Sequence, residues 1–449
     1  MHPPELVIRG RRVVIGDSIR PASLHTTRGY ISSISIFEDV SDGCELIEAD
    51  PDSVVMPGLV DTHVHVNEPG RTEWEGFRTA TRAAAAGGTT TLVDMPLNSI
   101  PATTTRRALE EKRAAADGEC LVDVAFWGGV VPGNLGELAA MTEAGVVGFK
   151  CFLIDSGVDE FGCVGEAELR PAMRDLQKLG VPLLAHAELA GPIEQAGPAL
   201  AGLDPACYAT YLASRPRAAE DEAIALLVRL CRETGARTHV VHHSSAGSLP
   251  ILRAARREGL PVSAETCPHY LRFAAEEIPD GATEYKCAPP IRERRNRESL
   301  WDALREGLLE LVASDHSPCT PALKKGSFSQ AWGGISGLQL ALAVTWTEAE
   351  RRGFSLRDVV RWMCEAPARL AGLSSRKGAL RPGLDADLVL FHPERTFHVE
   401  QPRLQHRHKL TPYAGAELKG VVEATYLRGR RVYDASGFAT PAAGELLAR

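Results

Sequence analysis

The 449-residue sequence predicts an α/β protein: a (β/α)8 barrel of the TIM type, with a small composite β-sandwich domain built from both termini. Three observations predict this fold. From about residue 54, short runs rich in β-forming residues alternate with helix-like stretches that end in glycine. There are eight such runs, the number of strands in this kind of barrel. Both ends of the chain instead carry short strand-like segments separated by turns.

The candidate barrel strands are the runs in which aliphatic and β-branched residues gather. They are residues 54–66, 89–96, 121–130, 146–153, 182–188, 238–245, 261–270 and 309–317. Between them lie helix-like stretches such as residues 72–88 and 219–235, which end in glycine, where a helix is expected to stop. A doubly wound open sheet is the alternative. It is disfavoured by the strand count and by the absence of a glycine-rich nucleotide-binding fingerprint from the sequence.

The two ends of the chain differ from the middle. Residues 1–56 include ELVIRGRRVVIGD, residues 374–449 include GALRPGLDADLVLF, and apolar residues alternate in both. We therefore expect one small β domain assembled from both ends, flanking a barrel of residues 57–373. Two unrelated caps are the alternative that the sequence leaves open.

Composition narrows the functional classes. The net charge of −8 gives no reason to expect a nucleic-acid partner. No apolar run reaches membrane-spanning length, and the start MHPPELVIRG lacks the features of a signal peptide, so we expect a cytoplasmic location and no membrane partner. The ten cysteines are scattered without a CxxC pair, which in this setting indicates reduced thiols.

Potential metal ligands close five of the eight strands. Active residues of a barrel gather at the C-terminal ends of its strands, so we asked which polar residues stand there. They are His63 and His65, Lys150, His186, His242 or His243, and Asp315. Each alone is more often structural than a ligand, but structural accidents would not all fall at one end of one sheet. Imidazole and carboxylate groups without thiolate suit Zn²⁺ and neighbouring divalent ions.

Lys150 is the odd member of this set. It is the one charged residue in the apolar run GVVGFKCFL, and burying a lone ammonium costs several kcal/mol. If CO₂ adds to its amine, the resulting carbamate can bridge two cations and the buried positive charge disappears. The alternative is a protonated lysine that reaches the barrel mouth and pairs with a carboxylate. The residues alone do not choose between the two.

Several motifs resemble one known family. MPGLVDTHVHVNEPGRTEWEGF, GFKCFLIDSGVDEFG, ETCPHYL, KCAPPIR, ASDHSPC, AWGGISGLQ and LTPYAG are similar to the allantoinase family, in the cyclic amidohydrolase branch of the amidohydrolase superfamily. The resemblance implies that His63, His65 and Asp315 bind one metal, that His186 and His242 bind a second, and that carboxylated Lys150 bridges both. The family pattern selects His242, and the extra His243 departs from it. Glu188, which shares a strand face with His186, is expected to orient that ring or a neighbour.

The resemblance also implies an activity. Two divalent cations, most simply zinc but also cobalt, manganese or iron, would share a hydroxide that attacks a ring amide, while Asp315 carries its proton to the leaving nitrogen. The expected reaction is hydrolysis of the hydantoin ring of allantoin to allantoate, by a homotetramer.

The substrate assignment depends on a few residues. Relatives that act on anionic dihydroorotate carry arginine two residues after the HxH pair, whereas Asn67 stands here and suits a neutral, ureido-substituted ring. Asn98 and Ser317 are further candidate substrate contacts, and loop capping is the alternative for each. A hydantoinase, dihydropyrimidinase or dihydroorotase is the runner-up activity, and a non-catalytic scaffold is the alternative from another class.

Overall fold

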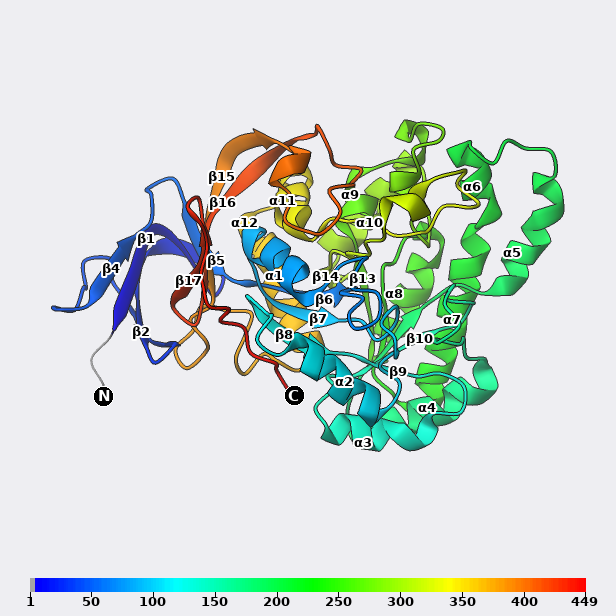
Figure 1. Ribbon diagram of the computed structural model, residues 1–449, viewed down its shortest axis with the longest axis horizontal. Coiled ribbons are helices and arrows are strands. Elements are labelled where there is room, and N and C mark those ends of the chain that lie inside the picture. Colours follow the sequence, from blue (N-terminus) through cyan, green and yellow to red (C-terminus); the bar gives the residue numbers. More distant parts are fainter. Residues whose placement is uncertain (1–4) are drawn as a thin grey trace.

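The chain is described over residues 5–449 by a computed structural model, in which helices surround two parallel sheets and a mixed sheet lies at one side (Figure 1). Residues 1–4, which the sequence analysis assigned to the small β domain, lie outside the described residues. The structure is thus a mixed α/β protein, as predicted.

The parallel sheets contain all eight predicted strands. Three strands pair in the order β6-β7-β8 and six in the order β14-β13-β12-β11-β10-β9. Their bounds are β6 (Leu59–Val64), β7 (Thr89–Asp94), β8 (Asp123–Phe126), β9 (Gly128–Gly129), β10 (Phe149–Phe152), β11 (Leu183–His186), β12 (Thr238–Val240), β13 (Val262–Thr266) and β14 (Leu311–Val312). The predicted run 121–130 holds both β8 and β9, which are separated by Trp127 alone.

The edges of these two sheets meet at both ends. On one side, β8 continues through Trp127 into β9 of the other sheet. On the other side, Val64 at the end of β6 forms a parallel bridge with His316, just beyond β14. The backbone amide of His65 donates to the carbonyl of His316 at 2.8 Å. The C-terminal ends of the first and last strands therefore lie side by side.

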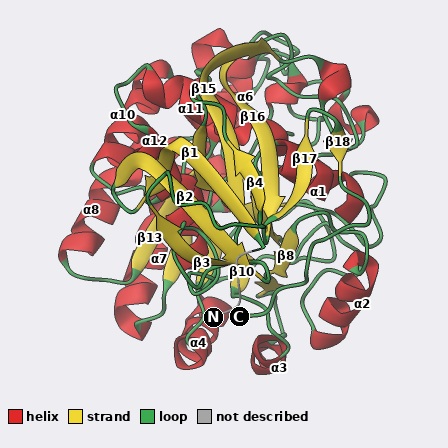
Figure 2. Cartoon of the chain, turned by 90° about the vertical axis from the view of Figure 1, so that its left-hand side faces the viewer, coloured by secondary structure: helices red, strands yellow, loops and turns green. Residues whose placement is uncertain are grey.

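Helices cover the outside of the parallel strands (Figure 2). Their bounds are α1 (Phe77–Ala86), α2 (Arg106–Ala116), α3 (Leu138–Glu143), α4 (Glu166–Leu179), α5 (Ala190–Ala196), α6 (Tyr208–Ser214), α7 (Arg217–Thr234), α8 (Leu249–Arg257), α9 (Pro268–Arg272), α10 (Arg294–Arg305), α11 (Ala341–Glu350), α12 (Leu356–Val360) and α13 (Ala366–Leu370). Helix α4 shows why they form: Leu169, Ala172, Met173 and Leu176 recur at helical spacing and are buried. The helix ends at Leu179 and is followed by Gly180, whose φ of 68° favours glycine.

Both ends of the chain contribute to the mixed sheet. Its nine strands run in the order β18-β17-β16-β15-β5-β1-β2-β3, with β4 paired to β1. They are β1 (Leu6–Ile15), β2 (Ser18–Thr27), β3 (Tyr30–Ser35), β4 (Glu45–Glu48), β5 (Val54–Pro57), β15 (Leu388–His398), β16 (Glu417–Leu427), β17 (Arg430–Asp434) and β18 (Gly437–Phe438). The pairing of β5 with β15 joins the N-terminal strands to the C-terminal strands.

One predicted strand is divided between two sheets. The run 54–66 breaks at Gly58, so that β5 pairs in the mixed sheet and β6 in a parallel sheet. The Cβ of any side chain at Gly58 would collide with the hydroxyl group of Thr90. The close approach of β7, which contains Thr90, explains why glycine stands between β5 and β6.

A buried cluster of charges connects the mixed sheet to the parallel strands. The Lys377 ammonium lies 2.5 Å from Asp123 of β8, 2.8 Å from Asp385 and 2.6 Å from Asp387. Arg428 adds a second cation at 2.6 Å from Asp123. Asp123, Asp385 and Asp387 have the arrangement of a possible metal site, but Lys377 already supplies their positive charge.

We expect the substitution Lys377→Met to lower the free energy of unfolding by about 3–5 kcal/mol, because it leaves buried carboxylates short of a cation. Urea denaturation measures the change. Lys178→Met is the matched control: that lysine is exposed on α4 and pairs with Asp175, so its loss should cost less than about 1 kcal/mol. Equal effects of the two substitutions would show that the cluster does not hold the sheets together.

Two further expectations concern the chain as a whole. All ten cysteines are free thiols in the structure, as predicted. Within residues 5–449, none of the helices has the length and apolar character needed to cross a membrane.

Candidate metal centre

The predicted ligands converge on one cavity of about 390 Å³ at the C-terminal ends of the parallel strands. His63 lies in β6, Lys150 in β10 and His186 at the end of β11, whereas His242 and Asp315 follow β12 and β14 by two and three residues. All six predicted ligands line the cavity: His63, His65, Lys150, His186, His242 and Asp315. The structure therefore brings all six together.

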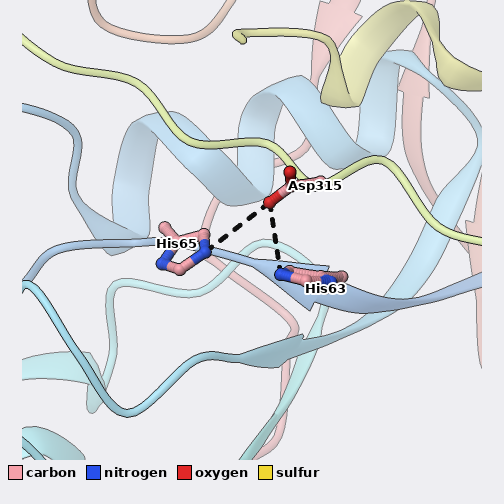
Figure 3. Close-up of side chains that lie close together, drawn as sticks. All are labelled: His63, His65 and Asp315. Atoms are coloured by element: carbon pink, nitrogen blue, oxygen red, sulfur yellow. Dashed lines mark ion pairs between the residues drawn. The ribbon is translucent and has the colours of Figure 1, made fainter. Parts of the chain in front are cut away.

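His63, His65 and Asp315 form the first group (Figure 3). Oδ1 of Asp315 lies 3.2 Å from Nε2 of His63 and 3.7 Å from Nε2 of His65, and all three side chains are buried. Within the described chain, Nε2 of His63 has no hydrogen-bond partner, although it is buried. A buried nitrogen with a free lone pair beside a second imidazole and a carboxylate fits a divalent metal.

His186 and His242 form the second group. Nδ1 of His186 faces Nε2 of His242 at 3.0 Å. Burial lowers the pKa of His186 and of His242, and it lowers the pKa of His65 to about 4. These rings are therefore neutral near pH 7 and keep the lone pairs that metal binding requires.

Lys150 lies in β10, which pairs with β11, the strand that carries His186, and only 1% of its surface is exposed. Burial lowers the pKa of its amine to about 8. Its Nζ lies 5.2 Å from the ring centre of Phe152 and forms no ion pair with any carboxylate of residues 5–449. The alternative of a lysine paired with a carboxylate is thus not what the structure shows.

The backbone leaves regular strand geometry at the site. Asn67, Asn98, His242 and Asp315 have φ of 66°, 70°, 38° and 45°, and they are four of the six non-glycine residues with positive φ in residues 5–449. This conformation costs roughly 1–2 kcal/mol per residue and often marks functional sites. It turns His242 and Asp315 into the cavity after their strands have ended.

Carboxylates behind the ligands fix two of the imidazoles. Glu265 Oε1 lies 2.5 Å from Nδ1 of His63, and its Oε2 lies 3.1 Å from Nε2 of His239. Glu188, as the sequence predicted, contacts Nε2 of His186 at 2.8 Å and also receives a hydrogen bond from Arg215 at 2.6 Å. Each carboxylate keeps a proton on one ring nitrogen and leaves the other free for a metal.

Sequence reasoning missed Glu265. His63 and His239 hold the pKa of its carboxyl below the usual range, against the effect of burial. A signal was present, because alternation along β13 places Glu265 on the same face as Ser263, whose hydroxyl contacts Nδ1 of His239 at 2.7 Å. His239 therefore contacts the same carboxylate as the predicted ligand His63.

We expect Glu265→Gln to weaken binding of the first metal by about 10- to 100-fold, because a neutral amide no longer fixes the proton on Nδ1 of His63. Competition with a chelator, read as metal content per chain, measures this affinity. Glu258→Gln is the control, since Glu258 is an exposed partner of Arg232. Unchanged metal affinity in Glu265→Gln would exclude the positioning role.

The predicted substrate contacts divide into two groups. Asn98 and Ser317 line the cavity, and the Asn98 amide lies 3.5 Å from Nδ1 of His65. Asn67 does not line it; this side chain is buried, and its amide donates to the carbonyl of Pro318 at 3.2 Å. His243 also lies outside the cavity, with Nε2 at 3.4 Å from the hydroxyl of Ser248.

The chain belongs to the amidohydrolase family, whose model matches residues 54–432. Proteins of this family bind divalent metal ions, and the groups described above supply the donor atoms for them.

Three curated relatives named allantoinase match nearly the whole chain. An allantoinase from Streptomyces avermitilis is 50% identical over 100% of both chains. The allantoinase of Saccharomyces cerevisiae is 43% identical over 99% of both, and that of Escherichia coli is 38% identical over 99% of this chain and 98% of its own.

Solved structures match the fold over its whole length. The L-hydantoinase (dihydropyrimidinase) of Arthrobacter aurescens superimposes with a TM-score of 0.94 at 31% identity, covering 99% of this chain and 100% of that one. The D-hydantoinase (dihydropyrimidinase) of Thermus sp. superimposes with a TM-score of 0.89 at 28% identity over 99% of both chains.

Proposed function

We propose that this protein is an allantoinase, which hydrolyses the hydantoin ring of allantoin to allantoate. The observation that carries this proposal is the convergence of four histidines, Asp315 and Lys150 on one cavity, in a chain that is 38–50% identical to allantoinases over nearly its full length. The scaffold alternative fits less well, because a complete ligand set is present.

The six cavity residues would hold two metals. His63, His65 and Asp315 would bind the first, His186 and His242 the second, and Lys150, carboxylated by CO₂, would contribute an oxygen to each. Zinc suits this donor set, and cobalt, manganese or iron would also be accepted. When bound, such cations lower the pKa of a shared water and polarise the amide carbonyl.

The protein side chains perform the proton transfers and hold the ring. Asp315 would accept the proton released by the attacking water and deliver it to the ring nitrogen as the C–N bond breaks, because an amide nitrogen leaves readily only when protonated. Asn98 and Ser317 line the cavity and would form hydrogen bonds with the substrate ring as donors or acceptors. Phe152 stacks on His186 with ring centres 4.5 Å apart, which fixes that imidazole from one side.

We also propose that the two parallel sheets are arcs of a single (β/α)8 barrel. The continuity of β8 with β9 and the bridge from Val64 to His316 support this closure. Residues 57–373 would form the barrel, and residues 1–56 and 374–449 the composite β domain. The homotetramer and the cytoplasmic location stay predictions from the sequence.

A substrate panel tests the function. Purified protein reconstituted with Zn²⁺ is assayed on allantoin, hydantoin, dihydrouracil and dihydroorotate. We expect allantoin to give the highest kcat/KM. A hydantoinase or dihydropyrimidinase is the second candidate, which the structural likeness at a TM-score of 0.94 favours. Turnover of dihydrouracil but not of allantoin would establish it instead.

A further inference from the structure

Part of the cavity wall carries positive charge that the metal ligands do not use. It is formed by Tyr211 of α6, by Arg215 just after this helix, by Lys286, and by the loop that contains Trp332. The Tyr211 hydroxyl donates to the carbonyl of Cys287 at 2.6 Å, which ties α6 to the segment that carries Lys286.

Both cations keep unused hydrogen-bond donors. The Lys286 ammonium has three N–H groups; it donates to the carbonyl of Ala331 at 2.5 Å and lies 5.4 Å from the ring centre of Tyr211. Throughout residues 5–449, no carboxylate forms an ion pair with it. One guanidinium nitrogen of Arg215 forms an ion pair with Glu188 at 2.6 Å, and 24% of the Arg215 side chain is exposed.

The charge of this wall is not neutralised inside the cavity. The carboxylates that line the cavity are Asp155 and Asp315. Asp315 contacts His63 and His65, whereas Asp155 is exposed and accepts a hydrogen bond from the backbone of Gly157 at 3.0 Å. Burial and the nearby Arg215 lower the pKa of Lys286 to about 8, which indicates a cation in need of an acceptor.

Allantoin offers such an acceptor. Its ureido group is attached to the ring carbon next to the carbonyl that must be attacked to give allantoate. A ring held with that carbonyl at the metal ligands therefore presents the ureido group to another part of the same cavity. We propose that Lys286 and Arg215 form the subsite for the ureido carbonyl and so select allantoin over unsubstituted hydantoin. This inference rests on the proposed function.

A carboxylate substituent, as in dihydroorotate, would also suit two cations. We favour the ureido group because Arg215 already shares its charge with Glu188, and because the remaining donors match a neutral, planar carbonyl. If replacing Lys286 lowered kcat/KM for dihydroorotate more than it lowered kcat/KM for allantoin, this choice would be overturned.

The test compares two substrates in the zinc-loaded enzyme. Lys286→Met removes the donors, and Lys286→Arg keeps them. KM is measured for allantoin, and KM or a competitive inhibition constant for hydantoin, which lacks the ureido group. We expect Lys286→Met to raise the constant for allantoin by about tenfold or more and that for hydantoin by less than about threefold. Lys286→Arg should restore most of the allantoin binding.

A structural control accompanies these variants. The Lys324 ammonium donates to the carbonyls of Trp332 at 2.9 Å and Gly334 at 2.5 Å, so it holds the same loop without lining the cavity. Lys324→Met should change the constants for both compounds together. The same pattern in Lys286→Met, or no effect on allantoin, would refute the subsite. Failure of the wild-type enzyme to hydrolyse allantoin would instead refute the proposed function.

Discussion

Replacement of Lys150 by alanine is expected to abolish binding of the metal pair and to lower kcat/KM for allantoin by about 10³-fold or more. The amine is buried in β10 and forms no ion pair with a carboxylate of the described chain, so as an ammonium it would be a buried charge without a counterion. As a carbamate it would supply two oxygens and a negative charge among the four imidazoles. Metal analysis and steady-state kinetics on the same preparation measure both effects.

Lys112 provides the matched control for Lys150. It is also 1% exposed, but its ammonium pairs with Asp94 at 2.5 Å. Lys112→Met should lower stability and leave the metal content unchanged. Because a carboxylate is what the alanine variant lacks, added propionate should restore part of its activity. Full metal content and full activity in Lys150→Ala would contradict the bridging role.

The sequence predicted the framework of this protein because its signals are local. Each of the eight runs of β-forming residues contains a strand, and polar residues at their ends mark the cavity. These features can be predicted without knowing the tertiary contacts, because strand alternation and chain direction alone place the side chains at the C-terminal ends of the strands.

Contacts between distant segments could not be predicted in this way. Glu265 reaches His63 across 202 positions of the chain, and the break of the first run at Gly58 depends on a neighbouring strand. Asn67, predicted to contact substrate from its place after the HxH pair, has a positive φ, and its amide donates to the carbonyl of Pro318. Alternation does not hold where the backbone leaves the strand conformation.

The second large effect is expected for Asp315→Asn, which should lower kcat by about 10²–10⁴-fold with little change in KM. An asparagine still occupies the space beside His63 and His65, but its amide cannot accept a proton from water and return it to the ring nitrogen. Since this transfer occurs only in the reaction, ground-state binding of allantoin should survive. Rapid-quench and steady-state kinetics, with metal content measured in parallel, separate the two contributions.

Asp155→Asn is the control for charge, because Asp155 lines the same cavity but is exposed and contacts only its own loop. Its loss should change kcat less than about threefold, as expected for an exposed carboxylate. If Asp315→Asn retained both metals and more than a tenth of the wild-type kcat, the proton would have to travel by another group. Asp315 would then be a ligand alone, and the geometry that places its Oδ1 at 3.2 Å from His63 would serve metal binding without proton transfer.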